Sequence, residues 1–86
     1  GLGDVYKRQV YELYREFPDT PIIGTGGVET WQDAVELLLA GASAVGIATA
    51  LRNGFNVIDR ILTGIREYLA QNSYKELGEI IGLAHK

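Results

Sequence analysis

Residues 21–28 read Pro-Ile-Ile-Gly-Thr-Gly-Gly-Val, and this stretch decides the fold of the 86-residue chain. Ile22-Ile23-Gly24 is a short apolar run between turn residues, which is typical of a parallel strand buried on both faces. Thr25-Gly26-Gly27-Val28-Glu29 then forms a glycine-rich loop. Thr30, with Asp33 three residues later, predicts the N-cap of a helix. The stretch therefore predicts a strand, a loop and a helix in succession.

The flanking sequence extends this order on both sides. Apolar periodicity predicts the last two turns of a helix at Val10–Phe17, a helix from Trp31 that Gly41 ends, and a helix from an Asn56 cap to Leu69. Ala42–Ile47 reads as a second strand, and a Ser73–Glu76 capping box predicts a last short helix that ends near Ile81. Strands that alternate with helices predict βαβ units with a parallel sheet, and hence an α/β fold. The positions that we expect to face the core are Val10, Leu13, Tyr14 and Phe17, then Trp31, Ala34, Val35 and Leu38, and then Ile58, Ile61, Leu62, Ile65 and Leu69.

Composition excludes several classes of function. The formal net charge of −3 provides no basic surface for nucleic acid or anionic lipid. No apolar run is long enough to cross a membrane, so we expect a cytoplasmic protein with no membrane partner. The chain contains no cysteine, which excludes disulfides, thiolate metal sites and a catalytic thiol within it. The lone histidine, His85, stands one residue from the end, where we expect it to have no partners for metal or acid–base work.

The first nine residues are interpreted separately from the remainder. Gly1–Gln9 resembles the in-frame translation of a sequencing adapter, so we expect this segment to be non-native and to pack poorly. Residues 10–86 then form the native part. The same interpretation implies a reading frame that was truncated upstream, which makes the chain a fragment.

Two loops form the candidate site. Gly26 and Gly27 follow the first strand, and Ala48 and Thr49 follow the second, so both loops lie at carboxyl ends of parallel strands, where α/β folds bind ligands. Glycines allow backbone N–H groups to approach an anion closely, and a helix N-terminus behind them favours negative charge. The hydroxyl of Thr49 can donate one further hydrogen bond. The pattern indicates a phosphate site, with a plain tight turn as the alternative interpretation of the glycine pair.

At this point the sequence resembles a known family. The segment Pro21–Val28, the run Trp31-Gln32-Asp33-Ala34 and the segment Ala40–Val45 resemble the last two βα units of class 1 dihydroorotate dehydrogenases. The ending Glu79–His85 resembles the NAD-linked, two-subunit branch of that family. The resemblance covers nearly all of residues 10–86. It implies the C-terminal portion, two βα units and a terminal helix, of an FMN-binding (β/α)₈ TIM barrel.

The resemblance also implies a function for these loops. In this family a Gly-Gly pair and a Gly-Thr pair hold the FMN phosphate, which corresponds here to Gly26, Gly27, Ala48 and Thr49. Ala48 departs from the family glycine, so a methyl group stands where the phosphate approaches. The family's catalytic base, its flavin-contacting lysine and its orotate-binding asparagines lie upstream, so no catalytic residue and no metal ligand is assigned in this chain.

The resemblance implies that the full-length protein is a flavoprotein oxidoreductase of pyrimidine biosynthesis that converts dihydroorotate to orotate. It implies a dimer, or a heterotetramer with an electron-transfer subunit that carries a flavin and an iron–sulfur cluster. The fragment alone is expected to be inactive. Two alternatives remain open at this point: the phosphate-binding segment of a non-redox TIM-barrel enzyme, and a non-enzymatic α/β interaction module.

Overall fold

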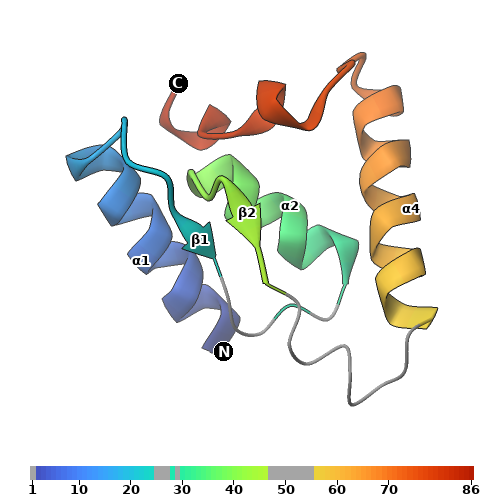
Figure 1. The fold of residues 1–86 in the computed structure, drawn as a ribbon, viewed down its shortest axis with the longest axis horizontal. Coiled ribbons are helices and arrows are strands. Elements are labelled where there is room, and N and C mark those ends of the chain that lie inside the picture. Colours follow the sequence, from blue (N-terminus) through green and yellow to red (C-terminus); the bar gives the residue numbers. More distant parts are fainter. Residues whose placement is uncertain (1, 25–27, 29, 47–55) are drawn as a thin grey trace.

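The computed structural model describes residues 2–24, 28, 30–46 and 56–86 of the chain. Its elements, in chain order, are α1 (Leu2–Glu16), β1 (Ile23–Gly24), α2 (Trp31–Ala40), β2 (Ala44–Val45), α4 (Asn56–Gln71) and the 3₁₀ helices η1 (Leu77–Ile80) and η2 (Leu83–His85). Figure 1 shows α2 at the centre, with α1 and α4 on either side of it and the C-terminal segment crossing over one end. Within these residues, no helix is long and apolar enough to span a membrane.

The two strands are parallel, as the sequence predicts. Ile23 pairs with Ala44 and Gly24 with Val45, and the N–H of Gly46 donates to the carbonyl of Gly24 at 2.8 Å. The second strand begins later than the predicted Ala42 because the N–H of that residue donates to the carbonyl of Leu37 at 2.9 Å. Ala42 therefore completes the end of α2 before the chain enters the sheet.

Helix α2 buries most of its apolar residues. Ala34, Val35 and Leu38 are buried, as predicted, and so are Leu37 and Ala40. The helix ends in a Schellman motif at Gly41 (φ 128°), whose N–H donates to Leu38 while that of Ala42 donates to Leu37. A side chain at Gly41 would overlap Tyr14 of α1, so this glycine serves both the helix end and the helix packing.

Helix α1 ends within the predicted last turns at Val10–Phe17, and towards the N-terminus it runs continuously through most of the first nine residues. Its predicted core stripe is only half correct: Val10 is buried and Tyr14 is half-buried, but Leu13 is 47% and Phe17 57% exposed. The described elements cover only one flank of this helix, which leaves the other flank uncovered.

Helix α4 packs against α2 through a close approach of backbone to side chain. Ile61 is fully buried between the helices, whereas Leu62, which was predicted to face the core, is 43% exposed. Gly64 lies against the indole of Trp31, and a Cβ there would overlap that ring. Trp31 also approaches Tyr68, with ring centroids 6.0 Å apart. Trp31 is therefore a packing residue. Asn56, which is predicted to cap α4, is instead the first residue of this helix.

The C-terminal segment differs from the predicted single helix. Ser73 does not cap it but ends α4 in the left-handed region, at φ 61°. Glu79 organises the next turn, because its carboxylate accepts from the N–H groups of Lys75 and Glu76 at 2.6 and 2.8 Å. Gly82 then separates the two short 3₁₀ turns, and its N–H donates to the carbonyl of Leu38 at 2.9 Å.

His85 has partners, although its place near the end of the sequence gives no sign of them. Its Nε2 lies 2.7 Å from the carbonyl oxygen of Ala40, which fixes Nε2 as the hydrogen-bond donor. Its ring stacks on Tyr11 at 3.9 Å and lies tilted against Tyr14 at 4.6 Å. The last residues of the chain thus join α1 to the end of α2.

Candidate functional site

The four predicted phosphate-binding residues, Gly26, Gly27, Ala48 and Thr49, lie outside the described residues. Their immediate neighbours are described and frame the first loop on both sides. Gly24 is buried in β1 and Val28 is buried at 1% exposure within the core. Both ends of the Thr25-Gly26-Gly27 stretch are therefore anchored.

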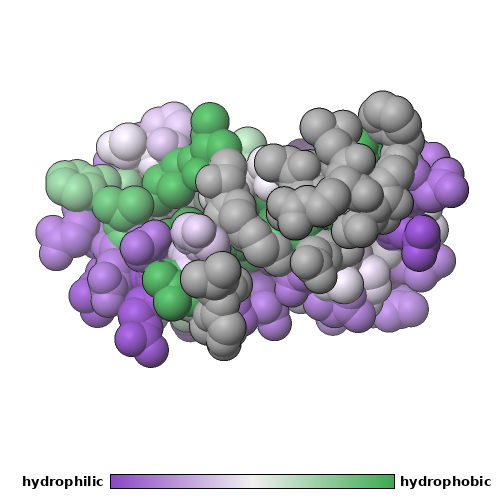
Figure 2. Space-filling view, turned by 90° about the horizontal axis from the view of Figure 1, so that it is seen from below, coloured by the Kyte–Doolittle hydropathy of each residue, from purple (hydrophilic) through white to green (hydrophobic). Residues whose placement is uncertain are grey.

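The strand register brings the starting points of the two loops together. Because the strands are parallel and Gly24 pairs with Val45, both strands end at the same carboxyl end of the sheet. Figure 2 looks at the molecule from this end: apolar residues gather in the upper left of the view, on the α1 and β1 side, and hydrophilic residues lie below them and along the right-hand rim. The parallel pairing of the strands thus agrees with the sequence prediction, and the two loops themselves lie outside the described residues.

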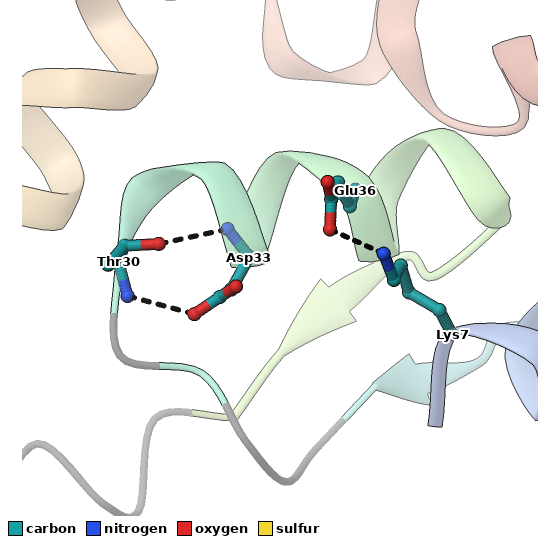
Figure 3. Close-up of polar contacts among 4 residues, drawn as sticks. All are labelled: Lys7, Thr30, Asp33 and Glu36. Carbon is teal, nitrogen blue, oxygen red and sulfur yellow. Dashed lines mark hydrogen bonds and ion pairs between the residues drawn. The ribbon is translucent and has the colours of Figure 1, made fainter. Parts of the chain in front are cut away.

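The N-terminus of α2, directly after the first loop, has a reciprocal capping box. Thr30 Oγ1 accepts from the N–H of Asp33 at 3.3 Å, and Asp33 Oδ2 accepts from the N–H of Thr30 at 3.2 Å (Figure 3). This confirms the predicted cap. It also places a carboxylate at the positive end of the helix dipole, where it offsets part of the attraction that the dipole would exert on a ligand anion.

An ion pair farther along α2 ties this helix to α1. Lys7 Nζ lies 2.7 Å from Glu36 Oε2, with the two side chains 32% and 48% exposed (Figure 3). Glu36 lies about two helical turns after the first loop, and an α-helix rises about 1.5 Å per residue. The pair connects α1 to α2 and lies outside the candidate site at the ends of the strands.

The comparisons with known proteins agree with this geometry. The family model described as dihydroorotate dehydrogenase matches residues 2–69. The chain belongs to the dihydroorotate dehydrogenase family. The prediction of the family from residues 21–45 is confirmed.

Several individual members of the dihydroorotate dehydrogenase family are similar to this chain. The catalytic subunit of dihydroorotate dehydrogenase B (NAD(+)) from Pyrococcus furiosus is 53% identical over 87 positions, covering 100% of this chain and 29% of the relative. The same subunit from Pyrococcus abyssi is 51% identical over 87 positions, with the same coverage. The crystal structure of the Eimeria tenella enzyme in complex with ferulenol is 30% identical, with a TM-score of 0.90 over 98% of this chain and 23% of that one.

The chain therefore spans about 29% of the length of the curated relatives. Its fold is a small α/β segment of a TIM barrel, as predicted, and its two strands are neighbouring parallel strands of that barrel. The enzyme class of the family, an oxidoreductase, is also as predicted. The match to residues 2–69 takes in most of the first nine residues, and the origin of that segment stays a prediction.

Proposed function

We propose that the full-length protein oxidises dihydroorotate to orotate and that this chain supplies the loops that hold the phosphate of FMN. The family membership carries this proposal, and the parallel pairing of the two strands that precede the loops in the sequence supports it. When bound, FMN supplies the hydride acceptor, and the protein contributes binding and orientation. The catalytic base and the substrate contacts belong to the part of the protein that this chain does not contain.

The residues assigned to the phosphate are Gly26, Gly27, Ala48 and Thr49. The described surroundings suit this role, because Gly24 and Val28 anchor the first loop on both sides. Since the carboxylate of Asp33 already occupies the end of α2, we assign the phosphate to the N–H groups of the loops rather than to the first turn of the helix. An acidic chain can hold a phosphate in this way without a basic side chain.

The NAD-linked relatives extend the proposal to a partner. The relative from Pyrococcus furiosus is a catalytic subunit by name. We propose that the full-length protein likewise works with a second subunit, which carries a flavin and an iron–sulfur cluster and passes electrons to NAD.

The loop assignment is tested with Gly27→Val in a full-length host, made by replacing the matching region of the Pyrococcus furiosus relative with this chain. The branched side chain blocks the approach of the phosphate and disfavours φ > 0. Each lost charge-assisted hydrogen bond costs about 1.5–3 kcal/mol, so FMN affinity should fall roughly tenfold or more per bond. Flavin content is measured by visible absorbance, and affinity by titration of the apoprotein.

Gly78→Val is the matched control, because a Cβ at Gly78 meets no atom within 4 Å. We expect this variant to retain its flavin. Gly27→Val should remain folded by circular dichroism, since the Thr30 cap lies beyond the substituted residue. A Gly27→Val protein with a full complement of flavin and unchanged affinity would show that the phosphate is held elsewhere.

A further inference from the structure

The first loop is held against α2 at both of its ends. It leaves β1 at Gly24, where a Cβ would lie 3.5 Å from the Leu37 side chain of α2, and it returns at Val28, which is 1% exposed within the core. The other face of β1 is open, since Ile23 is 70% exposed, so the predicted burial of this strand on both faces is wrong for the chain alone. The packing on α2 fixes the ends of the loop relative to the first turn of that helix.

The first turn of α2 carries a carboxylate close to the end of this loop. Asp33 is half-buried, and its Oδ2 accepts from the N–H of Thr30 at 3.2 Å. Three peptide bonds join Gly27 to Thr30, so the two Cα atoms are at most about 11 Å apart. This bound is comparable to the Debye length of about 10 Å at 0.1 M salt. The negative charge of Asp33 therefore acts on an anion that the loop binds.

The charge of Asp33 is separable from its role in the cap. Thr30 Oγ1 accepts from the N–H of Asp33 at 3.3 Å, and this half of the capping box uses only the backbone of residue 33. The other half needs an acceptor oxygen, which a neutral amide side chain also provides. The cap thus explains an oxygen at this position, while the negative charge has a separate effect on a neighbouring anion.

We propose that Asp33 is a specificity-determining residue, whose charge lowers the affinity of this site for the phosphate of FMN. A full charge at a helix N-terminus changes the free energy of a neighbouring anion enough to alter its affinity about two- to fivefold. The effect depends on the phosphate, so a flavin without a phosphate is not affected. This inference rests on the proposed function, because it takes the phosphate to be bound by the Thr25-Gly26-Gly27 loop.

The test is Asp33→Asn in the full-length host described above, because asparagine keeps an oxygen that accepts from Thr30 and removes the charge. The apoprotein is titrated with FMN and with riboflavin, and binding is followed by the quenching of flavin fluorescence. FMN affinity should rise about two- to fivefold at low salt. The gain should shrink in about 1 M salt, where the Debye length falls to about 3 Å. Riboflavin, which lacks the phosphate, should bind the parent and the variant equally.

Two further variants serve as controls. Asp33→Glu keeps the charge and the capping box, so its FMN affinity should stay that of the parent. Glu16→Gln removes the same charge from the exposed last residue of α1, which precedes the start of β1, and should change the affinity for neither flavin.

An unchanged FMN affinity in Asp33→Asn would overturn the proposal. So would an equal change for FMN and riboflavin, because Asp33 would then act through the fold of the site rather than on the phosphate. Gly27→Val separates these failures from failure of the loop assignment. If Gly27→Val loses FMN while Asp33→Asn gains none, only the role of Asp33 is wrong. If Gly27→Val keeps its FMN, the loop assignment is wrong, and the role of Asp33 is wrong with it.

Discussion

Gly64 is a residue whose role depends on a neighbour distant in sequence. In a helix interior, glycine is about 1 kcal/mol less favourable than alanine, so the sequence alone indicates a weak point in α4. The structure gives the reason for its presence: Trp31 of α2 lies where a Cβ would stand. The glycine thus permits the close contact between the two helices.

Gly64→Ala is therefore expected to destabilise this chain despite the better helix propensity of alanine. The indole of Trp31 must shift, and such overpacking costs about 1–3 kcal/mol. Urea unfolding followed by circular dichroism measures the change. Gly78→Ala, at a position with open space, should stay within about 0.5 kcal/mol of the parent chain. A stabilised Gly64→Ala variant would mean that propensity outweighs the contact with Trp31.

At the scale of the elements, the end of α4 stores a small amount of backbone strain. Ser73 has φ 61°, and the helix closes around it as a Schellman motif: its N–H donates to Ala70 at 3.2 Å, and that of Tyr74 donates to Leu69 at 2.8 Å. Glycine is the usual residue at this position because it has no Cβ penalty there.

Ser73→Gly should stabilise the chain by about 0.5–1 kcal/mol, since relief of the left-handed strain exceeds the added entropy of the unfolded chain. Ala70→Gly, three residues earlier in the right-handed helix, should have the opposite effect and cost about 1 kcal/mol. Both are measured as shifts of the urea midpoint. If the two glycines destabilise equally, the left-handed end of α4 carries no strain.

The sequence predicts correctly those features that depend on residues close together in the chain. It fails where a feature depends on contacts between residues far apart in the chain. The Thr30–Asp33 capping box, the glycine end of α2 and the parallel strands were predicted, because each depends on a local pattern or on alternation of strands and helices. The exposure of Leu13, Phe17 and Leu62 was missed, since periodicity marks an apolar face but does not say whether a neighbour covers it. The partners of His85 were missed because a contact with Ala40 spans 45 residues and has no local signal.

The candidate site was predictable to a similar degree. The family was identified because the Ala40–Val45 segment and the spacing from the glycine pair to Thr49 are more specific than the glycine loop alone. The pairing of the two strands followed from the alternation of strands and helices. The offset of the helix dipole by Asp33 required the structure, since the same Thr-x-x-Asp pattern predicts a cap but not its effect on a ligand anion. The contacts of Gly26, Gly27, Ala48 and Thr49 with a phosphate remain proposals.

At the scale of the whole molecule, the first nine residues can be tested for their contribution to the stability of the chain. Residues 2–9 form one continuous helix with Val10–Glu16, and Val5 is 51% exposed. One side-chain contact between these residues and α2 is the Lys7–Glu36 ion pair, whose side chains are 32% and 48% exposed. Exposed pairs of this kind contribute about 0–1 kcal/mol.

Deletion of Gly1–Gln9 should therefore lower the stability of the chain only slightly, by about the same amount as Lys7→Gln alone. The remaining residues of α1 keep the contacts of Val10 with the core and the stacking of Tyr11 on His85. Both variants are compared with the parent chain by urea unfolding. If the deletion costs about 2 kcal/mol more than Lys7→Gln, a value beyond most surface changes, the segment packs as a native part of α1. Its interpretation as an adapter-derived extension would then be wrong, because a sequence of foreign origin has no reason to fit the surface of α2.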